Sequence, residues 1–406
     1  MATTITTARR VLLIGGGNCG LALASGLQKA GIPYTVFESD TEDQFLRRTR
    51  DWGMLLHWGT EYLQRLIPER LHGRLNEITV DPNYEFKPNE TFPHLNADTG
   101  EIIGQVSMPT LTRVSRLRLR TFLSREQDLN IQFGKRLKTI SPDSSSEDVS
   151  VSFEDGARVK GACIIGCDGS RSRVREVLCG DKAKPQDVGV TMINHKARYP
   201  AEVAKLLRMH HPIVKLGFSK DQAAALVAVV DASDKDCPEN WYFQTYFAWW
   251  GPPYAEDLQD PRERLRYYKE RASKLCEPFC SAALALGDDE VVPVDAGQQW
   301  APFQWDNRGG RATLAGDAAH SMLPHRGQGL NNAMKDASEI VDALTAVYKG
   351  QRSLEEAITS YESEMIPRGA NEIRLTRIVA EKRRDMENKD PLILRGLQKA
   401  DPNAES

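Results

Sequence analysis

The segment 11–38 limits most strongly what this chain of 406 residues can fold into. An apolar run, Val11–Ile14, is followed by Gly15-Gly16-Gly17-Asn18-Cys19-Gly20 and then by helical spacing over 21–29. A second short apolar run, Tyr34–Phe37, ends at Glu38. This order of strand, glycine-rich turn, helix and strand predicts the βαβ unit of a Rossmann-like dinucleotide-binding fold.

The glycines and Glu38 have separate physical roles in such a unit. Gly15 permits the tight turn, Gly17 lets a pyrophosphate approach the backbone, and Gly20 lets the helix pack closely on the strand. The helix N-terminus offers amides and a positive dipole to phosphate. Glu38 is expected to accept hydrogen bonds from the adenosine ribose, and its charge disfavours a 2′-phosphate. The motif favours FAD or NAD over NADP without separating FAD from NAD, and a glycine-rich loop without a nucleotide is the alternative.

Later segments predict that a second layer interrupts the cofactor domain. Strands are expected at 131–140, 149–153 and 158–165, where apolar and polar residues alternate, and also at 223–230, 241–250 and 311–314. Asp155-Gly156 marks a hairpin turn, and helices are expected at 117–123, 261–276 and 331–348. The predicted fold class is α/β, with a discontinuous Rossmann-like cofactor domain, an inserted β-sheet substrate layer and C-terminal helices. The expected division is 8–180 and 303–350 for the cofactor domain, 181–302 for the substrate layer and 351–406 for a helical segment.

Composition excludes several classes of function. A net charge of −3 and a pI near 6.3 provide no basic field for nucleic acid. The N-terminus lacks a signal-like apolar core, and no stretch reaches the roughly 18 apolar residues that cross a bilayer. A soluble, cytoplasmic protein is therefore expected, as a monomer or homodimer. The seven scattered cysteines are expected to be reduced thiols, and the pairs Cys163/Cys167 and Cys276/Cys280 lack the partners of a metal site.

Three further segments resemble the single-component, flavin-dependent aromatic hydroxylases, the family of para-hydroxybenzoate hydroxylase and salicylate hydroxylase. Gly166-Cys-Asp168-Gly169-Ser-Arg-Ser-Arg-Val-Arg175 resembles the D-G motif of that family. Gly316-Asp317 and the following segment to Ala337 resemble its G-D motif, and Arg116–Leu123 resembles its arginine-led helix. The segment Arg50–Gly59 looks more like fungal secondary-metabolite monooxygenases than bacterial phenol hydroxylases, which puts a simple phenolic acid substrate in doubt.

The resemblance implies FAD, bound noncovalently, and assigns contacts to it. Asp317 is expected at a ribityl hydroxyl, Arg116 at the flavin phosphate or ribityl region, and Pro324 beside the reacting edge of the ring. Backbone amides of Gly327, Gln328, Gly329, Leu330 and Asn331 are expected at the pyrimidine edge. Leu330 departs from the smaller or more flexible residue often found there in the family, a change that would reshape the loop slightly.

Other assignments keep an alternative beside them. Asp168 and Gly169 are associated with FAD and the passing nicotinamide, but Asp168 would serve equally as a helix N-cap. For Arg116 the alternative is a surface ion pair. In the segment that begins at Arg50 and includes Gly53, Arg50 is expected to meet NAD(P)H or a flavin phosphate, and Trp52 to stack on the ring or to pack in the core.

The resemblance also implies a reaction. NAD(P)H would dock transiently, because the chain lacks a second dinucleotide fingerprint, and would reduce FAD. Reaction with O2 to a C4a-hydroperoxide would then hydroxylate, epoxidise or oxidatively rearrange a small hydrophobic or aromatic molecule. His57 and His325 are candidate substrate-facing residues, whereas His320 is expected to be structural.

Aromatic residues are candidates for the pocket wall. The run 241–250 is aromatic on both faces, which predicts one face in a core and the other over a pocket. Candidate pocket residues are Tyr242, Tyr246, Trp250 and Trp305, with ordinary core packing as the alternative. Two further functions remain open: a flavin oxidase or dehydrogenase on the same nucleotide fold, and a flavoprotein that binds without turnover or resembles geranylgeranyl reductase.

Overall fold

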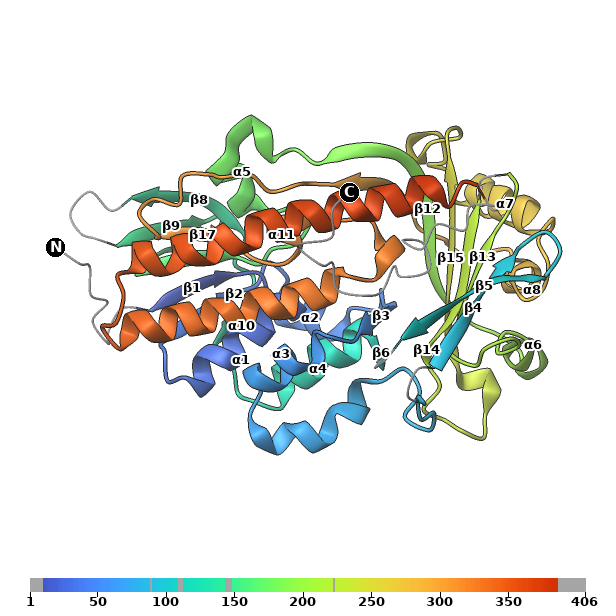
Figure 1. Cartoon of the computed structure of the whole chain (residues 1–406), viewed down its shortest axis with the longest axis horizontal. Coiled ribbons are helices and arrows are strands. Elements are labelled where there is room, and N and C mark those ends of the chain that lie inside the picture. Colours follow the sequence, from blue (N-terminus) through green and yellow to red (C-terminus); the bar gives the residue numbers. More distant parts are fainter. Residues whose placement is uncertain (1–9, 88–89, 109–111, 143–147, 222, 386–406) are drawn as a thin grey trace.

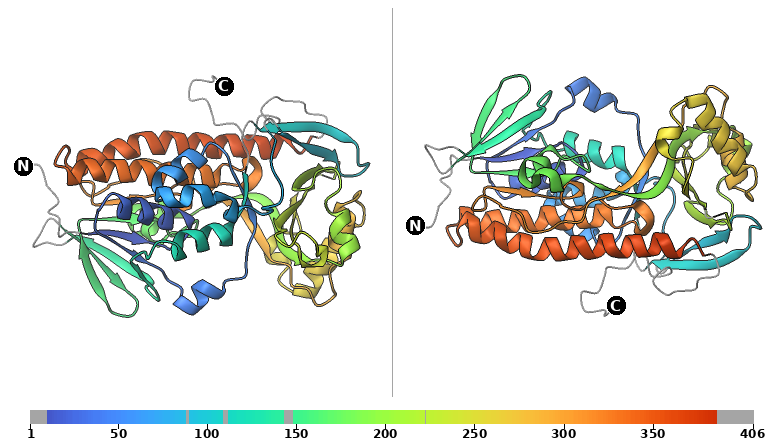
Figure 2. Two further views of the ribbon diagram at one scale, coloured as in Figure 1. Left: turned by 90° about the horizontal axis from the view of Figure 1, so that it is seen from below. Right: turned by 90° about the horizontal axis from the view of Figure 1, so that it is seen from above.

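The alternation of apolar segments along the chain builds two sheets at opposite ends of an elongated molecule (Figure 1). The computed structural model describes residues 10–87, 90–108, 112–142, 148–221 and 223–385. Two long helices, α10 (Gly329–Tyr348) and α11 (Leu354–Lys382), run along the end that holds the parallel sheet. The last turn of α11 reaches toward the other sheet in every view (Figures 1 and 2).

The predicted βαβ unit is confirmed and forms the centre of a five-stranded parallel sheet. Its strands, in the order β17-β11-β1-β2-β7, are Ala312–Leu314, Cys163–Gly166, Val11–Ile14, Tyr34–Phe37 and Ile131–Gln132. Every residue of β1, β2 and β11 is buried, as expected for a parallel sheet that is covered on both faces. The predicted α/β class is therefore confirmed.

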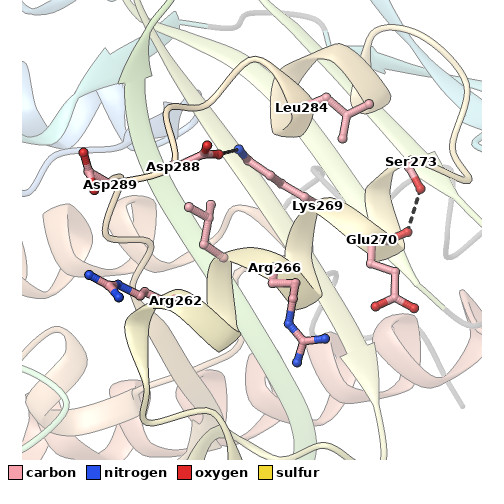
Figure 3. A pocket seen from close by; sticks show the side chains of 9 residues that line it. Arg262, Arg266, Lys269, Glu270, Ser273, Leu284, Asp288 and Asp289 are labelled. Atoms are coloured by element: carbon pink, nitrogen blue, oxygen red, sulfur yellow. Dashed lines mark hydrogen bonds and ion pairs between the residues drawn. The ribbon is translucent and has the colours of Figure 1, made fainter.

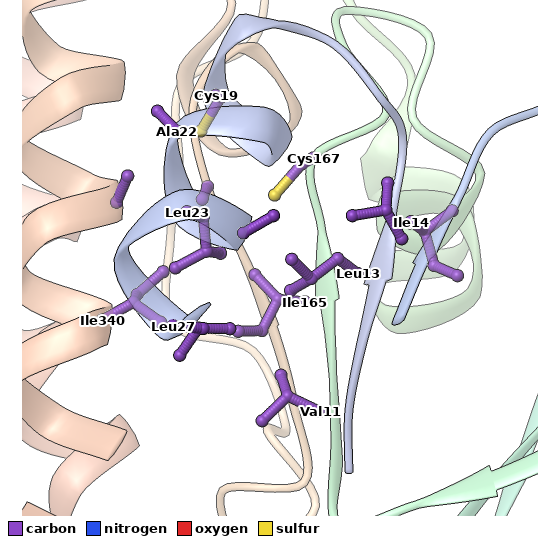
Figure 4. Packing of buried hydrophobic residues seen from close by; sticks show 14 of the residues in the cluster. Val11, Leu13, Ile14, Cys19, Ala22, Leu23, Leu27, Ile165, Cys167 and Ile340 are labelled. Atoms are coloured by element: carbon purple, nitrogen blue, oxygen red, sulfur yellow. The ribbon is translucent and has the colours of Figure 1, made fainter. Parts of the chain in front are cut away.

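Helix α1 (Asn18–Lys29) fills the space between this sheet and α10 (Figure 4). Leu23 and Leu27 point from α1 into the cluster that Ile165 of β11 and Ile340 of α10 also enter. These side chains are fully buried, and burying each apolar side chain contributes about 1.5–3 kcal/mol. This packing fixes the N-terminus of α1 at the carboxyl edge of the sheet.

Two of the expected strands are each divided between different sheets. The run 158–165 separates into β10 (Arg158–Gly161) and β11, because the chain leaves a small antiparallel sheet and enters the parallel one at Ala162. The run 131–140 similarly separates into β7 and β8 (Leu137–Pro142) around Gly134, which has φ +69°. The expected hairpin at Asp155-Gly156 is confirmed, since β9 (Val149–Phe153) pairs with β10 in antiparallel register.

The second sheet has seven strands in the order β16-β12-β15-β14-β13-β4-β5. Its bounds are Val294–Gln299, Gln186–Arg198, Tyr242–Trp250, Ala224–Asp231, Val214–Phe218, Glu90–Asn96 and Ile102–Met108. Strands β4 and β5 come from the stretch that the sequence assigned to the first part of the cofactor domain, yet β4 pairs with β13. This sheet is therefore assembled from two separate parts of the chain.

Strand β15 presents its aromatic residues to two environments, as its sequence predicts. Phe243, Phe247 and Trp249 point into a second core. Helices α7 (Pro261–Ala272) and α8 (Phe279–Leu284) cover that side of the sheet. The alternate residue Gln244 instead accepts hydrogen bonds from the backbone N–H of Gly53 and from the guanidinium of Arg113, so this second face looks toward the cofactor part.

The remaining elements connect the two sheets. They are α2 (Glu42–Arg47), β3 (Gly53–Leu56), α3 (Thr60–Leu66), β6 (Thr112–Ser115), α4 (Arg116–Arg125), α5 (Arg173–Cys179), α6 (Ala201–Leu206) and α9 (Asp317–His320). Short 3-10 turns include η5 (Pro324–Arg326). No helix in the described part of the chain combines the length and apolar character needed to cross a membrane. All seven cysteines are free thiols.

Candidate functional site

Three loops that are far apart in sequence meet at the carboxyl edge of the parallel sheet. The adjacent strands β1, β11 and β17 end at Ile14, Gly166 and Leu314, just before Gly15, Cys167 and Gly316 respectively. A Cβ atom on Gly15 would lie 2.6 Å from the carbonyl oxygen of Cys167, and one on Gly316 would lie 3.1 Å from Cys19. Gly15 and Gly316 also have φ values of +106° and +61°, which favour glycine. The glycine fingerprint, the D-G motif and the G-D motif therefore form one continuous site.

The fingerprint glycines divide into packed and open positions. A side chain on Gly20 would overlap the carbonyl oxygen of Gly15, so this glycine is needed for close packing. A Cβ atom on Gly17 would meet no protein atom within 4 Å, so space is open there. Gly17 also precedes α1, whose first turn receives no hydrogen bond from a capping side chain. Uncapped amides beside open space suit an anionic group such as phosphate.

Glu38 lies directly beside the fingerprint, as its sequence position predicts. Its Oε2 atom accepts a hydrogen bond from the backbone N–H of Gly16 at 2.8 Å. Its Oε1 atom accepts from the backbone N–H of Asp40 at 2.8 Å and from the hydroxyl of Ser39 at 3.1 Å. Glu38 is buried, so these bonds fix its orientation at the end of β2. The carboxylate joins the second strand to the turn after the first.

Asp168 binds the first turn of α5, although the N-cap position that was one of its two expected roles belongs to Ser172. Its carboxylate accepts hydrogen bonds from the backbone N–H groups of Arg173 at 2.7 Å and Val174 at 3.2 Å, and from the hydroxyl of Ser172. Burial raises the pKa of Asp168, and these bonds oppose the rise. The neighbouring Gly169 has φ +81°, and a Cβ atom there would meet no atom within 4 Å.

Asp317 differs from Asp168 because its carboxylate is exposed and has no hydrogen-bond partner among the described residues. Its Oδ1 atom lies 3.9 Å from where Gly329 would carry a Cβ atom. Desolvation by the surrounding protein raises the pKa of Asp317, while His320, Arg116 and Arg175 oppose the rise. This carboxylate can accept a hydrogen bond from a ligand that lies between the G-D motif and the loop before α10.

Two buried residues hold these motifs in place, and the sequence analysis assigned no role to either of them. Arg175 donates to the carbonyl oxygens of Ala318 at 3.1 Å and Ala183 at 3.0 Å, and it stacks on Trp300. Asp336 accepts from the backbone N–H of Gly316 at 2.8 Å and pairs with Arg368 at 2.7 Å. Both residues stand within the recognised motifs, but their spacing alone does not reveal which distant backbone they hold.

His320 has the structural role that the sequence predicts. It is fully buried, and its Nε2 atom lies 2.6 Å from the carboxylate of Asp336. Burial raises the pKa of Asp336, but His320 and Arg368 outweigh this effect and hold it below the usual range. The pair anchors α9 to α10.

The side chain of Asn331, in the first turn of α10, ties β3 to this helix and to the loop before it. Asn331 accepts hydrogen bonds from the backbone N–H groups of His57 and Gly59, both at 3.0 Å. It donates to the carbonyl oxygens of Leu55 and Gly327, both at 3.1 Å. The side chain is fully buried, so all four of these bonds are internal to the protein.

The other residues of this loop differ in exposure. Gln328 accepts a hydrogen bond from the indole N–H of Trp58 at 3.0 Å, and Leu330 packs in the first core. Pro324 is exposed at the start of η5, and Gly327 has φ +60°. The side chains of Gln328, Leu330 and Asn331 are therefore committed to the protein. Only backbone groups of this loop are left to meet a ligand.

Trp52, which the sequence expected to stack on the cofactor ring or to pack in the core, is covered by two arginine side chains in the structure. The guanidinium of Arg116 lies 4.6 Å from the centre of the indole and that of Arg50 lies 5.8 Å from it. Arg50 also pairs with Asp295 at 2.5 Å, in an exposed position. The alternative of a surface ion pair for Arg116 is wrong, because no carboxylate in the described ranges lies within ion-pairing distance of it.

Gly53 lies against protein groups. A Cβ atom there would overlap the guanidinium of Arg113, and the N–H of Gly53 donates to Gln244 at 3.0 Å. Arg113 is buried and donates to Gln244 at 2.6 Å. Gly53 therefore permits β3 to approach the second sheet, which accounts for the glycine without a cofactor contact.

The candidate pocket residues occupy three different environments. Tyr246 lies on the face of β15 toward the cofactor part, and its ring meets that of His325 edge-on with centres 6.4 Å apart. Tyr242 is covered by Lys196 at 4.6 Å, and Trp250 by Arg384 at 5.0 Å. Trp305 lies apart from these three residues, in the first core.

Trp305 belongs to the first core, where it packs on Trp300 with ring centres 6.4 Å apart. Of the two roles expected for Trp305, pocket wall and core packing, the structure shows core packing, apart from Tyr246 on the second sheet. The segment 300–307 follows β16 and joins the first core through Trp300 and Trp305.

His57 and His325 are held neutral at pH 7. Burial lowers the pKa of His57 to about 4, opposed by a hydrogen bond with the backbone of Gly327. Burial lowers the pKa of His325 to about 3, and Arg383 lowers it further. The Nε2 atom of His57 and the Nδ1 atom of His325 are buried without a hydrogen-bond partner in the described structure. Each can therefore bond to a ligand as a neutral imidazole.

A hollow of about 700 Å³ lies apart from these residues, between α7, α8 and the segment 288–289 (Figure 3). Charges of both signs line it, and Lys269 pairs with Asp288 at 2.9 Å. The hollow is behind the second sheet, on the side away from the cofactor part. In the described residues, no cluster of three or more histidine, cysteine or acidic side chains has the arrangement of a metal site.

Comparison with known sequences matches residues 8–376 to the family described as FAD binding domain. A relative described as an FAD-dependent monooxygenase, phnB of Penicillium herquei, is 35% identical over 367 residues, which cover 89% of this chain and 88% of the relative. The FAD-dependent monooxygenase cctM of Talaromyces islandicus is 34% identical, over 90% of both chains.

Solved structures with the same fold include 2,6-dihydroxypyridine-3-hydroxylase from Arthrobacter nicotinovorans. Its TM-score is 0.78, with 21% identity and complete coverage of both chains. HpxO from Klebsiella pneumoniae, complexed with FAD and uric acid, has a TM-score of 0.72 with 22% identity, and the match covers 96% of this chain and 94% of that one.

Proposed function

The chain belongs to the FAD-dependent monooxygenases that carry an FAD binding domain, and from this premise we propose that it oxygenates a small hydrophobic or aromatic metabolite. The proposed co-substrates are NAD(P)H and O2. The proposed outcome is hydroxylation, epoxidation or oxidative rearrangement within the biosynthesis of a secondary metabolite. The relatives from Penicillium and Talaromyces, both moulds, support this setting.

The observation that carries the proposal is the convergence of the three motif loops at one sheet edge. Open space at Gly17, the uncapped start of α1 and the unpartnered carboxylate of Asp317 are three separate features that a flavin dinucleotide would satisfy. Phosphate needs amide donors and a ribityl hydroxyl needs an acceptor. The residues present therefore fit FAD.

Each part of FAD has a candidate partner in this site. We assign the pyrophosphate to the backbone between Gly15 and Gly17 and the adenosine ribose to Glu38. Asp317 is assigned to a ribityl hydroxyl. The backbone of 327–331 is assigned to the pyrimidine edge of the flavin. Arg116 supplies positive charge close to Asp317, which suits a phosphate or ribityl oxygen.

When bound, FAD would supply the redox chemistry of a reaction in which NAD(P)H is the reductant, one oxygen atom of O2 enters the product and the other becomes water. The protein must bind the substrate and exclude bulk water from it. Strand β15 provides a wall with apolar and aromatic character, on which Tyr246 is a polar group, and His325 of η5 faces Tyr246. We place the substrate between this wall and the loop that begins at Pro324.

We propose that NAD(P)H docks transiently at the same site. Arg50 and Arg116, which both lie over the ring of Trp52, offer positive charge beside an aromatic surface. Arg50 is exposed, and its partner Asp295 can release it to a phosphate at a modest cost, since exposed ion pairs contribute about 0–1 kcal/mol. This arrangement favours docking from the solvent side.

The proposal is tested by following both oxygen and reductant. Purified protein is expected to carry FAD that acid precipitation releases, and candidate substrates are expected to stimulate NAD(P)H oxidation. With ¹⁸O2, one labelled oxygen atom is expected in the product. A flavin oxidase or dehydrogenase would instead form an unlabelled product without consuming NAD(P)H, and that outcome would reject the monooxygenase reaction.

A further inference from the structure

Four buried polar groups around Tyr246 of β15 lack the hydrogen bonds that burial demands. They are the hydroxyl of Tyr246, Nδ1 of His325, Nε2 of His94 and Nε of Arg383, and within the described structure none has a partner. A polar group that is buried without a partner is unfavourable, because it has lost its hydrogen bonds to water and gained none in return. Four such groups gathered in one region indicate a ligand whose oxygen atoms complete them.

These groups form one contiguous cluster, which we call the Arg383 cluster. Arg383 donates from Nη1 to the carbonyl oxygen of His325 at 2.8 Å, and His325 meets Tyr246 edge-on. The guanidinium of Arg383 lies 5.3 Å from the ring centre of Phe218, and His94 meets the same ring with centres 5.5 Å apart. The C-terminus of α11, the turn η5 and three strands of the second sheet, β4, β13 and β15, thus converge here.

The cluster carries one positive charge with nothing to neutralise it. Burial lowers the pKa of Arg383 to about 10, so the guanidinium stays charged at pH 7. No carboxylate in the part of the chain that the structure describes pairs with Arg383, whereas the neighbouring Arg326 pairs with Glu372. His94 and His325 are neutral because burial lowers the pKa of each to about 3. The ligand that fits must bring an anionic oxygen.

The position of the cluster relates it to the proposed reaction. Arg383 holds the backbone of His325, the residue that follows Pro324, and Pro324 begins the loop assigned to the flavin. Tyr246 lies on the face of β15 that looks toward the cofactor part. An oxygen atom held by Arg383 and Tyr246 would therefore lie beside the loop where the substrate is placed.

We propose that Arg383 is the specificity-determining residue for the substrate: its guanidinium, with the hydroxyl of Tyr246 as a neutral donor, binds an oxyanion carried by an otherwise flat, apolar molecule. The oxyanion is a phenolate, an enolate or a carboxylate. This inference rests on the proposed function, because it places the substrate of that reaction. Phe218 and the ring of Tyr246 supply the apolar contact surfaces.

The test measures binding to the FAD-loaded enzyme at pH 8.5, using three probes with the same ring. They are 4-nitrophenolate, 4-nitrobenzoate and the neutral ether 4-nitroanisole. Wild type is expected to bind at least one of the anions roughly 10- to 150-fold more tightly than the ether, the range of a charge-assisted hydrogen bond. The anion that is preferred distinguishes a phenolate-type site from a carboxylate site.

Single substitutions then show which residues are responsible for the preference for the anion. Arg383→Met is expected to abolish the preference for the anion, Arg383→Lys to retain part of it, and Tyr246→Phe to weaken it while keeping the ring. The matched control is Arg377→Met, which removes an exposed arginine of the same helix that pairs with Glu381. Its anion preference is expected to equal that of wild type.

The outcomes separate this inference from the function on which it rests. Wild type that lacks FAD or never oxidises NAD(P)H would reject the proposed function. Wild type that is active but binds the ether as tightly as both anions, or binds neither anion at millimolar concentration, would overturn the role of Arg383. The same holds if Arg383→Met keeps the preference. If Arg383→Met loses FAD, Arg383→Lys and Tyr246→Phe decide the question by the same measurement.

Discussion

Removing the side chain of Asn331 should release β3 and the start of α3 from the loop before α10. In Asn331→Ala, the backbone N–H groups of His57 and Gly59 lose their acceptor while they stay buried. An orphaned buried N–H costs about 1–3 kcal/mol, which corresponds to roughly 5- to 150-fold faster amide exchange if this bond limits local opening. The two carbonyl oxygens of Leu55 and Gly327 also lose their donors.

Hydrogen–deuterium exchange of the FAD-loaded protein measures this directly, in peptides that cover residues 55–60. The matched control is Asn332→Ala, which removes a buried asparagine from the next position of the same helix. Asn332 contacts Gln328 and Arg368 and leaves His57 and Gly59 untouched. Exchange in 55–60 is therefore expected to accelerate in Asn331→Ala and to stay at the wild-type rate in the control.

Asn331→Asp separates the acceptor role from the donor role. Its carboxylate can still accept from the N–H groups of His57 and Gly59, but it cannot donate to the two carbonyl oxygens. Protection of residues 55–60 is expected to persist, while FAD binds more weakly because the backbone at Gly327 is no longer held. Equal exchange of residues 55–60 in wild type and Asn331→Ala, or equal acceleration in Asn332→Ala, would refute the role of Asn331 in holding this segment.

Three other predictions use the same structure. Gly17→Ala is expected to change the stability of the apoprotein by less than about 1 kcal/mol and to weaken FAD binding, because the added Cβ atom meets only open space. Gly20→Ala should prevent folding, because its Cβ atom would overlap the carbonyl oxygen of Gly15. Unfolding curves and FAD titrations that are the same for the two variants would contradict this. At saturating FAD, Asp317→Ala should divert a larger share of NAD(P)H to hydrogen peroxide, and coupling and FAD affinity that both match wild type would reject its ribityl role. Burial lowers histidine pKa values from 6.5 to about 4 or about 3 at three positions, which are His57, His94 and His325. The unfolded chain then takes up protons first, so stability should fall as the pH drops from 6.5 toward 4, by up to about 1.4 kcal/mol per pH unit for each histidine; an unfolding midpoint constant over that range would refute it.

Much of the cofactor part was predictable because its signals are local. The fingerprint from Gly15 to Gly20 specifies a turn and a helix start within a few residues, and Glu38 follows at the end of the next strand. The strand boundaries could not be predicted as well from the sequence. Alternation over 158–165 is continuous in sequence, and only the pairing of β10 with β9 and of β11 with β1 divides it.

Side-chain roles at the site depended on partners that are far away in the chain. Trp52 was expected to stack on a flavin ring or to pack in the core, and in the structure Arg116 covers it because β3 and β6 pair side by side. Trp305 was a candidate for the pocket wall or for core packing, and it packs in the first core against Trp300. Neither the cation nor the core is visible in the residues that flank each tryptophan.

The sequence by itself determined the nucleotide unit, the order of the three motifs and the family, since each of these depends on residues that are close along the chain. Only the tertiary structure decided what the motif side chains do. Asn331 hydrogen-bonds the backbone of His57, which is 274 residues away in the sequence, and Arg383 hydrogen-bonds the backbone of His325, which is 58 residues away. The physical reason is that hydrogen bonds and burial act between neighbours in space, and packing brings those neighbours together from segments whose own patterns do not refer to each other.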